Sequence, residues 1–156
     1  MARTDHYQDP DAPKPTSVVI AASAFVLDPA RRLLMIRRTD SGLYALPGGT
    51  HELGETMTET AIRETEEETG MTVQVVGLIG VYSNPAHVIE FSDGEVRQEF
   101  SICFRAQPIT GELRPSDESS EVLWVEADRI DALDVHPSIR LRIEHGYAER
   151  EHPYYT

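Results

Sequence analysis

GGTHELGETMTETAIRETEEETG, residues 48–70, contains seven glutamates and only one arginine, Arg63. Its second half carries the end signals of a helix from Thr56 to Thr69. Thr56 and Glu59 fit the S/T-x-x-E capping box, and Gly70 stands where a left-handed residue ends a helix. The segment therefore predicts a helix with strong negative charge, and its surroundings decide what balances that charge.

The helix gathers carboxylates on one side. At 100° per residue, Glu64, Glu67 and Glu68 share an arc of roughly 100°. The opposite face is a thin apolar stripe, made of Thr58, Ile62, Thr65 and Thr69 with Ala61 at its edge. Each carboxylate pair costs a few tenths of a kcal/mol in open water but about 3 kcal/mol at ~6 Å in a cleft of effective dielectric about 20. Either the helix is an ordinary solvated one, or a hard cation such as Mg²⁺ or Mn²⁺ binds there.

The spacing of the surrounding residues resembles the Nudix box, G-x5-E-x7-R-E-U-x-E-E-x-G-U, in which U is a bulky apolar residue. The invariant positions are matched in order by Gly49, Glu55, Arg63, Glu64, Glu67, Glu68 and Gly70, with apolar Met71 after them. Thr65 departs from the pattern at the first apolar site, which weakens the expected packing of the helix. At lower specificity the resemblance extends over residues 17–147, through the lead-in YALPGG and a later strand with Trp124.

The resemblance implies an α/β (α+β) fold, a Nudix-type α/β/α sandwich with a mixed sheet, and hydrolysis of a nucleoside diphosphate linked to another group. It implies that Glu67 and Glu68 ligate the metal. Glu64 would be a further ligand, or would orient or deprotonate the attacking water, and the Gly49 carbonyl would complete the coordination. Mg²⁺, with Mn²⁺ as an alternative, would be the cofactor.

The remaining pattern predicts the other elements. We expect a flexible N-terminal arm over residues 1–16 and a single domain over residues 17–150. Strands are predicted at 17–28, 32–38, 71–83 and 121–127, with a hairpin of 88–91 and 95–107 and a final helix that begins near Pro137. Strands on both sides of a helix favour a mixed-sheet α/β or α+β domain. The resemblance also implies that Glu55 and Arg63 tie the loop to the helix.

The composition limits the kinds of molecule that the protein is expected to bind. The chain has 156 residues and a net charge of −13, and it lacks a cluster of Lys and Arg, so we expect no polymeric nucleic acid and no anionic membrane as a partner. A small anionic substrate can still bind through a cation.

The lone Cys103 lies in an apolar run, which predicts a buried thiol. The polar, proline-rich N-terminus predicts a soluble, cytoplasmic protein.

Several residues outside the box are weaker candidates. Arg37 and Arg38 end a strand just before the glycines, where one of them can bind phosphate, or both are a solvated strand end. Tyr44 and Phe91 can stack on a base or pack in the core, which is also the expected place of Trp124.

A later loop can supply another carboxylate as base or ligand. The candidates are Glu95, Glu99, Glu118 and Glu121, any of which can also be merely exposed. Glu99 lies on an alternating strand and can face the site. His87 and His136 look isolated, without a partner at metal-ligand spacing, so no catalytic role is predicted for them.

The sequence is compatible with two classes of substrate. Pro85 lies 14 residues beyond Met71, which gives weak support to ADP-ribose or a nucleotide sugar, and an oxidised or non-standard nucleoside triphosphate is the close alternative. Other classes are a catalytically inactive nucleotide-binding module and a calcium-buffering acidic protein, although no D-x-D-x-D-G loop supports the latter. A homodimer is expected from the resemblance alone.

Overall fold

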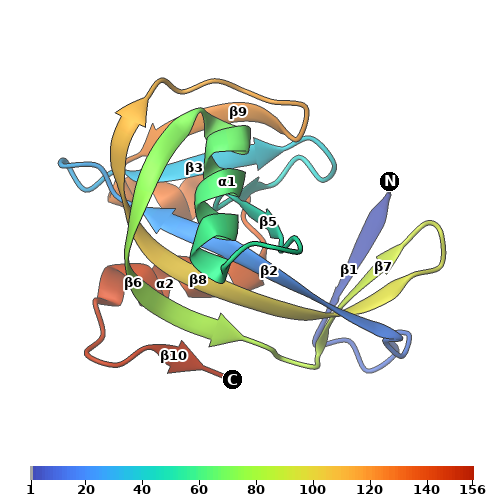
Figure 1. The fold of residues 1–156 in the computed structure, drawn as a ribbon. Helices are drawn as coiled ribbons and strands as arrows, with labels where there is room; N and C mark the ends of the chain where they lie inside the picture. The colour runs from blue at the N-terminus through green and yellow to red at the C-terminus, as the bar shows by residue number, and fades with distance from the viewer. Residues whose placement is uncertain (1) are drawn as a thin grey trace.

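The computed structural model describes residues 2–156. Its elements are β1 (Arg3–Tyr7), β2 (Ser17–Val26), β3 (Leu33–Arg38), β4 (Tyr44–Ala45), β5 (Gly48–Thr50), α1 (Met57–Thr69), β6 (Met71–Tyr82), β7 (His87–Phe91), β8 (Val96–Gly111), β9 (Ser119–Val125), the 3₁₀ helix η1 (Ala127–Ala132), α2 (Pro137–Ala148) and β10 (Tyr154–Tyr155). Figure 1 shows α1 lying along the sheet in the middle of the molecule.

The larger sheet is organised around β2 and β8. These two strands run parallel, with Ser17 opposite Arg97 and Val26 opposite Ala106. Strand β5 joins the free edge of β2, while β6 and β7 pair antiparallel with β8. The result is a mixed sheet with β8 at its centre, in which β5, just before α1, forms the edge beside β2.

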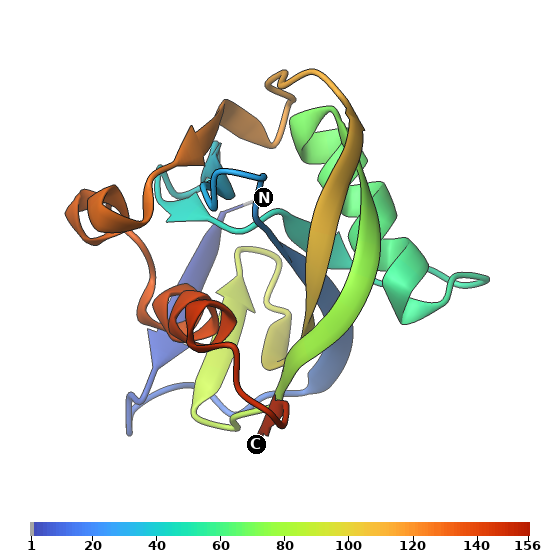
Figure 2. The same ribbon diagram turned by 90° about the vertical axis from the view of Figure 1, so that its left-hand side faces the viewer.

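Helices cover the two faces of this sheet (Figures 1 and 2). Alternate residues of β2 supply both cores, as expected for a strand buried on both faces. Phe25 packs in the cluster that includes Ile143 of α2, and Val26 packs in the cluster that Ile62 of α1 contacts. A smaller sheet, in the order β4-β3-β9, completes the fold. The mixed-sheet α/β/α sandwich is confirmed.

Most predicted elements are present with small changes of boundary. The helix after Thr56, the hairpin of β7 and β8, and the final helix with Pro137 in its first turn all form. Cys103 is fully buried, and Trp124 packs against the core from a partly buried position. Within residues 2–156, each helix is too short and too polar to cross a membrane.

The predicted flexible arm is wrong for residues 3–7. These residues form β1, which pairs antiparallel with β7, from Arg3 opposite Phe91 to Tyr7 opposite His87. The segment RTDHY lacks the apolar alternation of a strand that packs on a core. Backbone hydrogen bonds to an edge strand do not require that alternation, which explains why the pattern gives no signal.

Candidate active site

Both ends of α1 are fixed by local hydrogen bonds. The Thr56 hydroxyl accepts from the Glu59 backbone N–H, and the Glu59 carboxylate accepts from the Thr56 backbone N–H, so the capping box is complete. At the other end Gly70 adopts φ of 82° and donates its N–H to the Glu66 carbonyl. These contacts set the start and length of the helix, as the sequence predicts.

An ion pair joins α1 to the loop before it. Arg63 donates from Nε to Glu55 at 2.6 Å and from Nη2 to Glu55 at 3.0 Å, and Nη2 also donates to the Thr50 carbonyl at 3.1 Å. Hydrogen bonds from Arg63 lower the pKa of Glu55 to about 2. This pair ties the glycine loop to the helix, which is the arrangement that the resemblance implies.

The rotation of α1 differs from the expected one. Glu64 and Glu68 are only 8% and 4% exposed and lie on the buried side with Thr65, whereas the Glu67 side chain is 60% exposed. The hydroxyl of Thr65 donates to the Ala61 carbonyl at 2.7 Å. With its hydroxyl satisfied inside the helix, a threonine packs through its methyl group. The threonine stripe therefore turns inward and takes two of the carboxylates with it.

Glu67 occupies the rim. It accepts from Arg63 at 3.3 Å and lines a shallow hollow with Ile62 and Arg114. The structure thus brings Glu64 and Glu68 together and leaves Glu67 beside them, facing outward.

The two glycines of β5 let the buried carboxylates reach the backbone. A Cβ on Gly49 would lie 2.5 Å from the carboxyl carbon of Glu64. A Cβ on Gly48 would lie 2.5 Å from the Ala22 carbonyl oxygen. The Gly48 N–H donates to Glu68 Oε1 over a long 3.4 Å. The missing Cβ of Gly49 lets the Glu64 carboxylate of α1 lie against β5, and the missing Cβ of Gly48 lets β5 lie close to β2.

Burial makes the charges of these carboxylates unfavourable. Burial first, and then the charge of Glu64, raise the pKa of Glu68 to about 8. Burial also raises the pKa of Glu64, although Arg63, which donates to it at 2.9 Å, partly offsets this. Two buried carboxylates with so little compensation require a proton or a cation.

A third carboxylate completes the group. Oxygens of Glu64, Glu68 and Glu118 lie within 4.8 Å of one another. The Ser119 hydroxyl donates to the Glu68 backbone carbonyl at 2.6 Å, which holds the segment carrying Glu118 against α1. A set made only of oxygen atoms fits a hard divalent cation such as Mg²⁺ or Mn²⁺.

The other late carboxylates lie elsewhere. Glu99, one of the candidates to face the site, instead lies 3.5 Å from Arg142. Glu95 pairs with Arg97 at 2.6 Å, and Glu121 accepts from the Tyr44 hydroxyl. Sequence spacing could not select Glu118, because its place depends on the contact of Ser119 with α1.

Arg37 and Arg38, the two arginines before the glycines, have different partners. Arg38 donates to Asp40 at 2.9 and 2.7 Å, and the charge of Glu68 adds to these bonds in raising the pKa of Arg38. Arg37 instead donates to the Gly42 carbonyl at 3.0 Å and lies over the Tyr44 ring, 5.6 Å from its centre. Of the two, Arg38 is the one placed near the buried carboxylates.

Three aromatic or histidine predictions need revision. Phe91 is not part of the hydrophobic core: it lies under the guanidinium of Arg97, which is 4.4 Å from its ring centre. His87 and His136 are not isolated: their rings stack with centres 5.2 Å apart and planes 15° apart. His87 lies on β7 and His136 just before α2, far apart in the chain, so spacing along the sequence cannot reveal that they are close.

Comparison with known proteins agrees with this geometry. A family model described as the NUDIX domain matches residues 18–145. A MutT-like protein of Streptomyces ambofaciens is 37% identical over 79% of this chain and 73% of its own length. An ADP-ribose pyrophosphatase of Methanocaldococcus jannaschii is 34% identical over 69% of this chain and 62% of its own. A putative 8-oxo-dGTP diphosphatase of Bacillus subtilis is 34% identical over 70% of this chain and 67% of its own.

Solved structures share the fold. A NUDIX hydrolase from Nitrosomonas europaea superposes with a TM-score of 0.69 at 21% identity, covering 87% of this chain and 93% of that one. A MutT protein from Methanosarcina mazei superposes with a TM-score of 0.69 at 22% identity, covering 90% of this chain and all (100%) of that one.

Proposed function

Because the chain belongs to the Nudix family of pyrophosphohydrolases, we propose that it uses Mg²⁺ to cleave the pyrophosphate of a nucleoside diphosphate linked to another group. The observation that carries the proposal is the group of Glu64, Glu68 and Glu118 beside the glycines of β5. Glu64 and Glu68 are buried carboxylates that repel each other, and a divalent cation relieves that repulsion.

Each residue has a proposed role. Glu64, Glu68 and Glu118 would hold the ion, and the Gly49 carbonyl and Glu67 would contribute as the family resemblance implies. When bound, Mg²⁺ neutralises charge on the pyrophosphate and lowers the pKa of a coordinated water. Glu64, held by Arg63 at 2.9 Å, orients the attacking water or accepts its proton.

Substrate phosphate is assigned to Arg38. The charge of Glu68 contributes to the raised pKa of Arg38, which supports Arg38 rather than Arg37 for this role. Arg37 and Tyr44 are held together next to Glu121, where they form a second, more exposed candidate surface for the rest of the substrate.

For the substrate we favour ADP-ribose or a nucleotide sugar, in keeping with the name of the archaeal relative. The bacillar relative supports an oxidised nucleoside triphosphate as the second candidate, at the same 34% identity. A panel of both kinds with Mg²⁺ separates them by product chromatography: AMP with a sugar phosphate in the first case, a nucleoside monophosphate with pyrophosphate in the second.

The role of the buried carboxylates is tested by Glu68→Gln, with Glu66→Gln as the control on the exposed side of the same helix. We expect Glu68→Gln to lower kcat/KM by at least about 100-fold, because metal binding supplies several kcal/mol of transition-state stabilisation. EDTA should abolish wild-type turnover and Mg²⁺ should restore it. Unchanged turnover in Glu68→Gln would refute the metal assignment. Nucleotide binding without turnover of any substrate would instead indicate an inactive binding module.

A further inference from the structure

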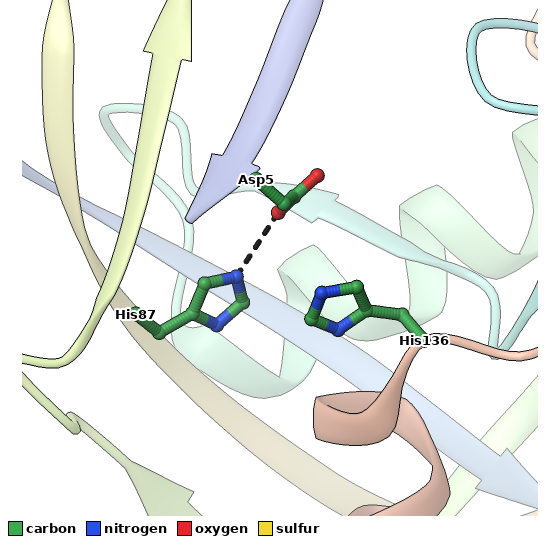
Figure 3. Close-up of side chains that lie close together, drawn as sticks. All are labelled: Asp5, His87 and His136. Atoms are coloured by element: carbon green, nitrogen blue, oxygen red, sulfur yellow. Dashed lines mark hydrogen bonds and ion pairs between the residues drawn. The ribbon is translucent and has the colours of Figure 1, made fainter. Parts of the chain in front are cut away.

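Within residues 2–156, one group of side chains besides Glu64, Glu68 and Glu118 has the composition of a metal site. Asp5, His87 and His136 each place a ligand atom within 4.8 Å of the other two. Figure 3 shows the three side chains pointing toward one another from β1, β7 and the residue before α2. We propose that they form a second cation site, which binds a transition metal such as Zn²⁺ or Co²⁺.

The sheet aligns two of the ligands. Tyr7 lies opposite His87 and Asp5 lies opposite Ile89 in the antiparallel pair of β1 and β7, so Asp5 and His87 are diagonal neighbours on one face. Asp5 Oδ1 lies 3.0 Å from His87 Nε2. A metal ion would take the place of the proton shared by these two atoms, as happens when imidazole ligates a metal.

The third ligand comes from the start of α2. His136 Nδ1 lies 2.8 Å from the Ser138 hydroxyl and 3.2 Å from the Ser138 backbone nitrogen. Nδ1 accepts from the Ser138 backbone N–H, so in the metal-free protein the neutral ring carries its proton on Nε2. Metal binding at Nε2 would move that proton to Nδ1, which then donates to the Ser138 hydroxyl in place of the cap. Figure 3 shows Nε2 facing Asp5 and His87. A hydrogen bond on the far nitrogen is the usual way in which a protein orients a ligating histidine.

The ligand set selects the ion. Two imidazole nitrogens and one carboxylate oxygen suit Zn²⁺, Co²⁺, Ni²⁺ or Cu²⁺, whereas Mg²⁺ prefers oxygen ligands alone. Bonds of about 2.0–2.1 Å in a tetrahedral site need ligand atoms about 3.3 Å apart, so the three side chains close slightly around the ion. Three protein ligands leave one position for water.

Neighbouring groups fix the orientation of the proposed ligands and favour the protonation states that can bind a metal. Arg3 donates to both oxygens of Asp5, at 2.8 and 3.1 Å, and so fixes the plane of the carboxylate. Burial alone would raise the pKa of Asp5, but hydrogen bonds from His87 and Arg3 hold it well below its usual range. Burial lowers the pKa of His136, which favours the neutral, ligating form. His87 is 5% exposed, and the edge of Tyr7 packs against its ring.

Calorimetry tests the site with Zn²⁺ as the probe and excess Mg²⁺ present, so that the carboxylates of α1 are filled. We expect one equivalent of Zn²⁺ to bind the wild-type protein. His87→Gln keeps a hydrogen-bond donor for Asp5, and His136→Asn keeps a residue that caps a helix. Each should weaken Zn²⁺ binding by more than about tenfold. His6→Gln is the matched control, because His6 is also on β1 but contacts Asp9 and Glu90 instead.

A second readout identifies the ligands. Co²⁺ bound by two imidazoles and a carboxylate at low coordination number gives visible absorption, which should be lost in His136→Asn and kept in His6→Gln. Circular dichroism confirms that each variant is folded, and His136→Asn decides the matter if His87→Gln does not fold. Equal Zn²⁺ affinity in wild type and His136→Asn would overturn the site. So would Zn²⁺ binding that disappears in Glu68→Gln but not in the histidine variants, or no wild-type binding below about 1 mM.

Discussion

Gly49 has only a hydrogen atom where other residues have a Cβ, and the carboxylate of Glu64 lies directly against it. Any Cβ there would lie 2.5 Å from the carboxyl carbon of Glu64. We expect Gly49→Ala to displace Glu64 and lower kcat/KM by about 100-fold, the effect of a 1 Å misplacement in an active site. Steady-state kinetics measures this, with Gly77→Ala as the control, because a Cβ on Gly77 meets its nearest neighbour at an ordinary 3.9 Å. Wild-type kinetics in Gly49→Ala would mean that Glu64 is free to move aside without loss.

Glu68 gives the metal-free protein a defined pH dependence. Its pKa rises from an ordinary 4.5 to about 8 on folding, so between these values the folded state holds a proton that the unfolded state has released. Its contribution to stability is full below about pH 4.5 and is lost as pH rises through 8. In EDTA, Glu68→Gln should flatten this decline and gain up to about 5 kcal/mol at pH 9 relative to wild type, at about 1.4 kcal/mol for each unit of the pKa difference.

Urea unfolding at pH 5 and pH 9 measures that difference. Adding Mg²⁺ should stabilise the wild-type protein at pH 9 more than Glu68→Gln, because the ion binds the ionised carboxylate. Parallel pH curves for the two proteins, without and with Mg²⁺, would show that Glu68 keeps an ordinary pKa.

Among the elements, α1 shows which contacts are local enough to predict. Thr56→Ala removes the hydroxyl of the capping box and should lower the free energy of unfolding by about 1 kcal/mol, while Thr56→Ser should keep it. Urea unfolding compares the two. Equal losses in both variants would mean that the methyl group of Thr56, and not its hydroxyl, stabilises the helix.

The ends of α1 could be read from sequence because the capping box and Gly70 act within one turn. Its buried face could not. Thr65 reads as a polar residue at an apolar position, yet it is fully buried with its hydroxyl bonded to the Ala61 carbonyl. The three carboxylates share one side of the helix as predicted, but Glu64 and Glu68 are buried whereas Glu67 faces solvent.

For the whole molecule, the sequence predicts the sandwich but not the contacts that close it. Strand β1 depends on pairing with β7, more than 80 residues later, and Glu118 depends on the hydroxyl of Ser119 reaching α1. Neither contact leaves a local pattern. The sequence therefore offers Glu118 only as one of several candidate carboxylates, and it does not predict the proposed group of Asp5, His87 and His136 at all.

Removing residues 1–8 tests the contribution of β1. The deletion leaves β7 as an unpaired edge and uncovers His87, and it should lower the free energy of unfolding by about 2 kcal/mol. Deleting residues 154–156, which carry only the two-residue β10, should cost less. Thermal or urea unfolding of the two truncated proteins compares them. An equal or smaller loss in the N-terminal deletion would contradict a stabilising role for β1.

The parallel pairing of β2 with β8 also dictates an order of events during synthesis. Residues 17–26 emerge from the ribosome well before residues 97–106, and everything from Gly49 to Gly70 lies in the loop that their pairing closes. The helix can form as soon as it is translated, but Glu118, which lies with Glu64 and Glu68, follows β8 in the chain. If the proposed Mg²⁺ site forms, it should therefore form late in the maturation of this chain, and nascent chains that stop short of residue 97 should not retain the ion.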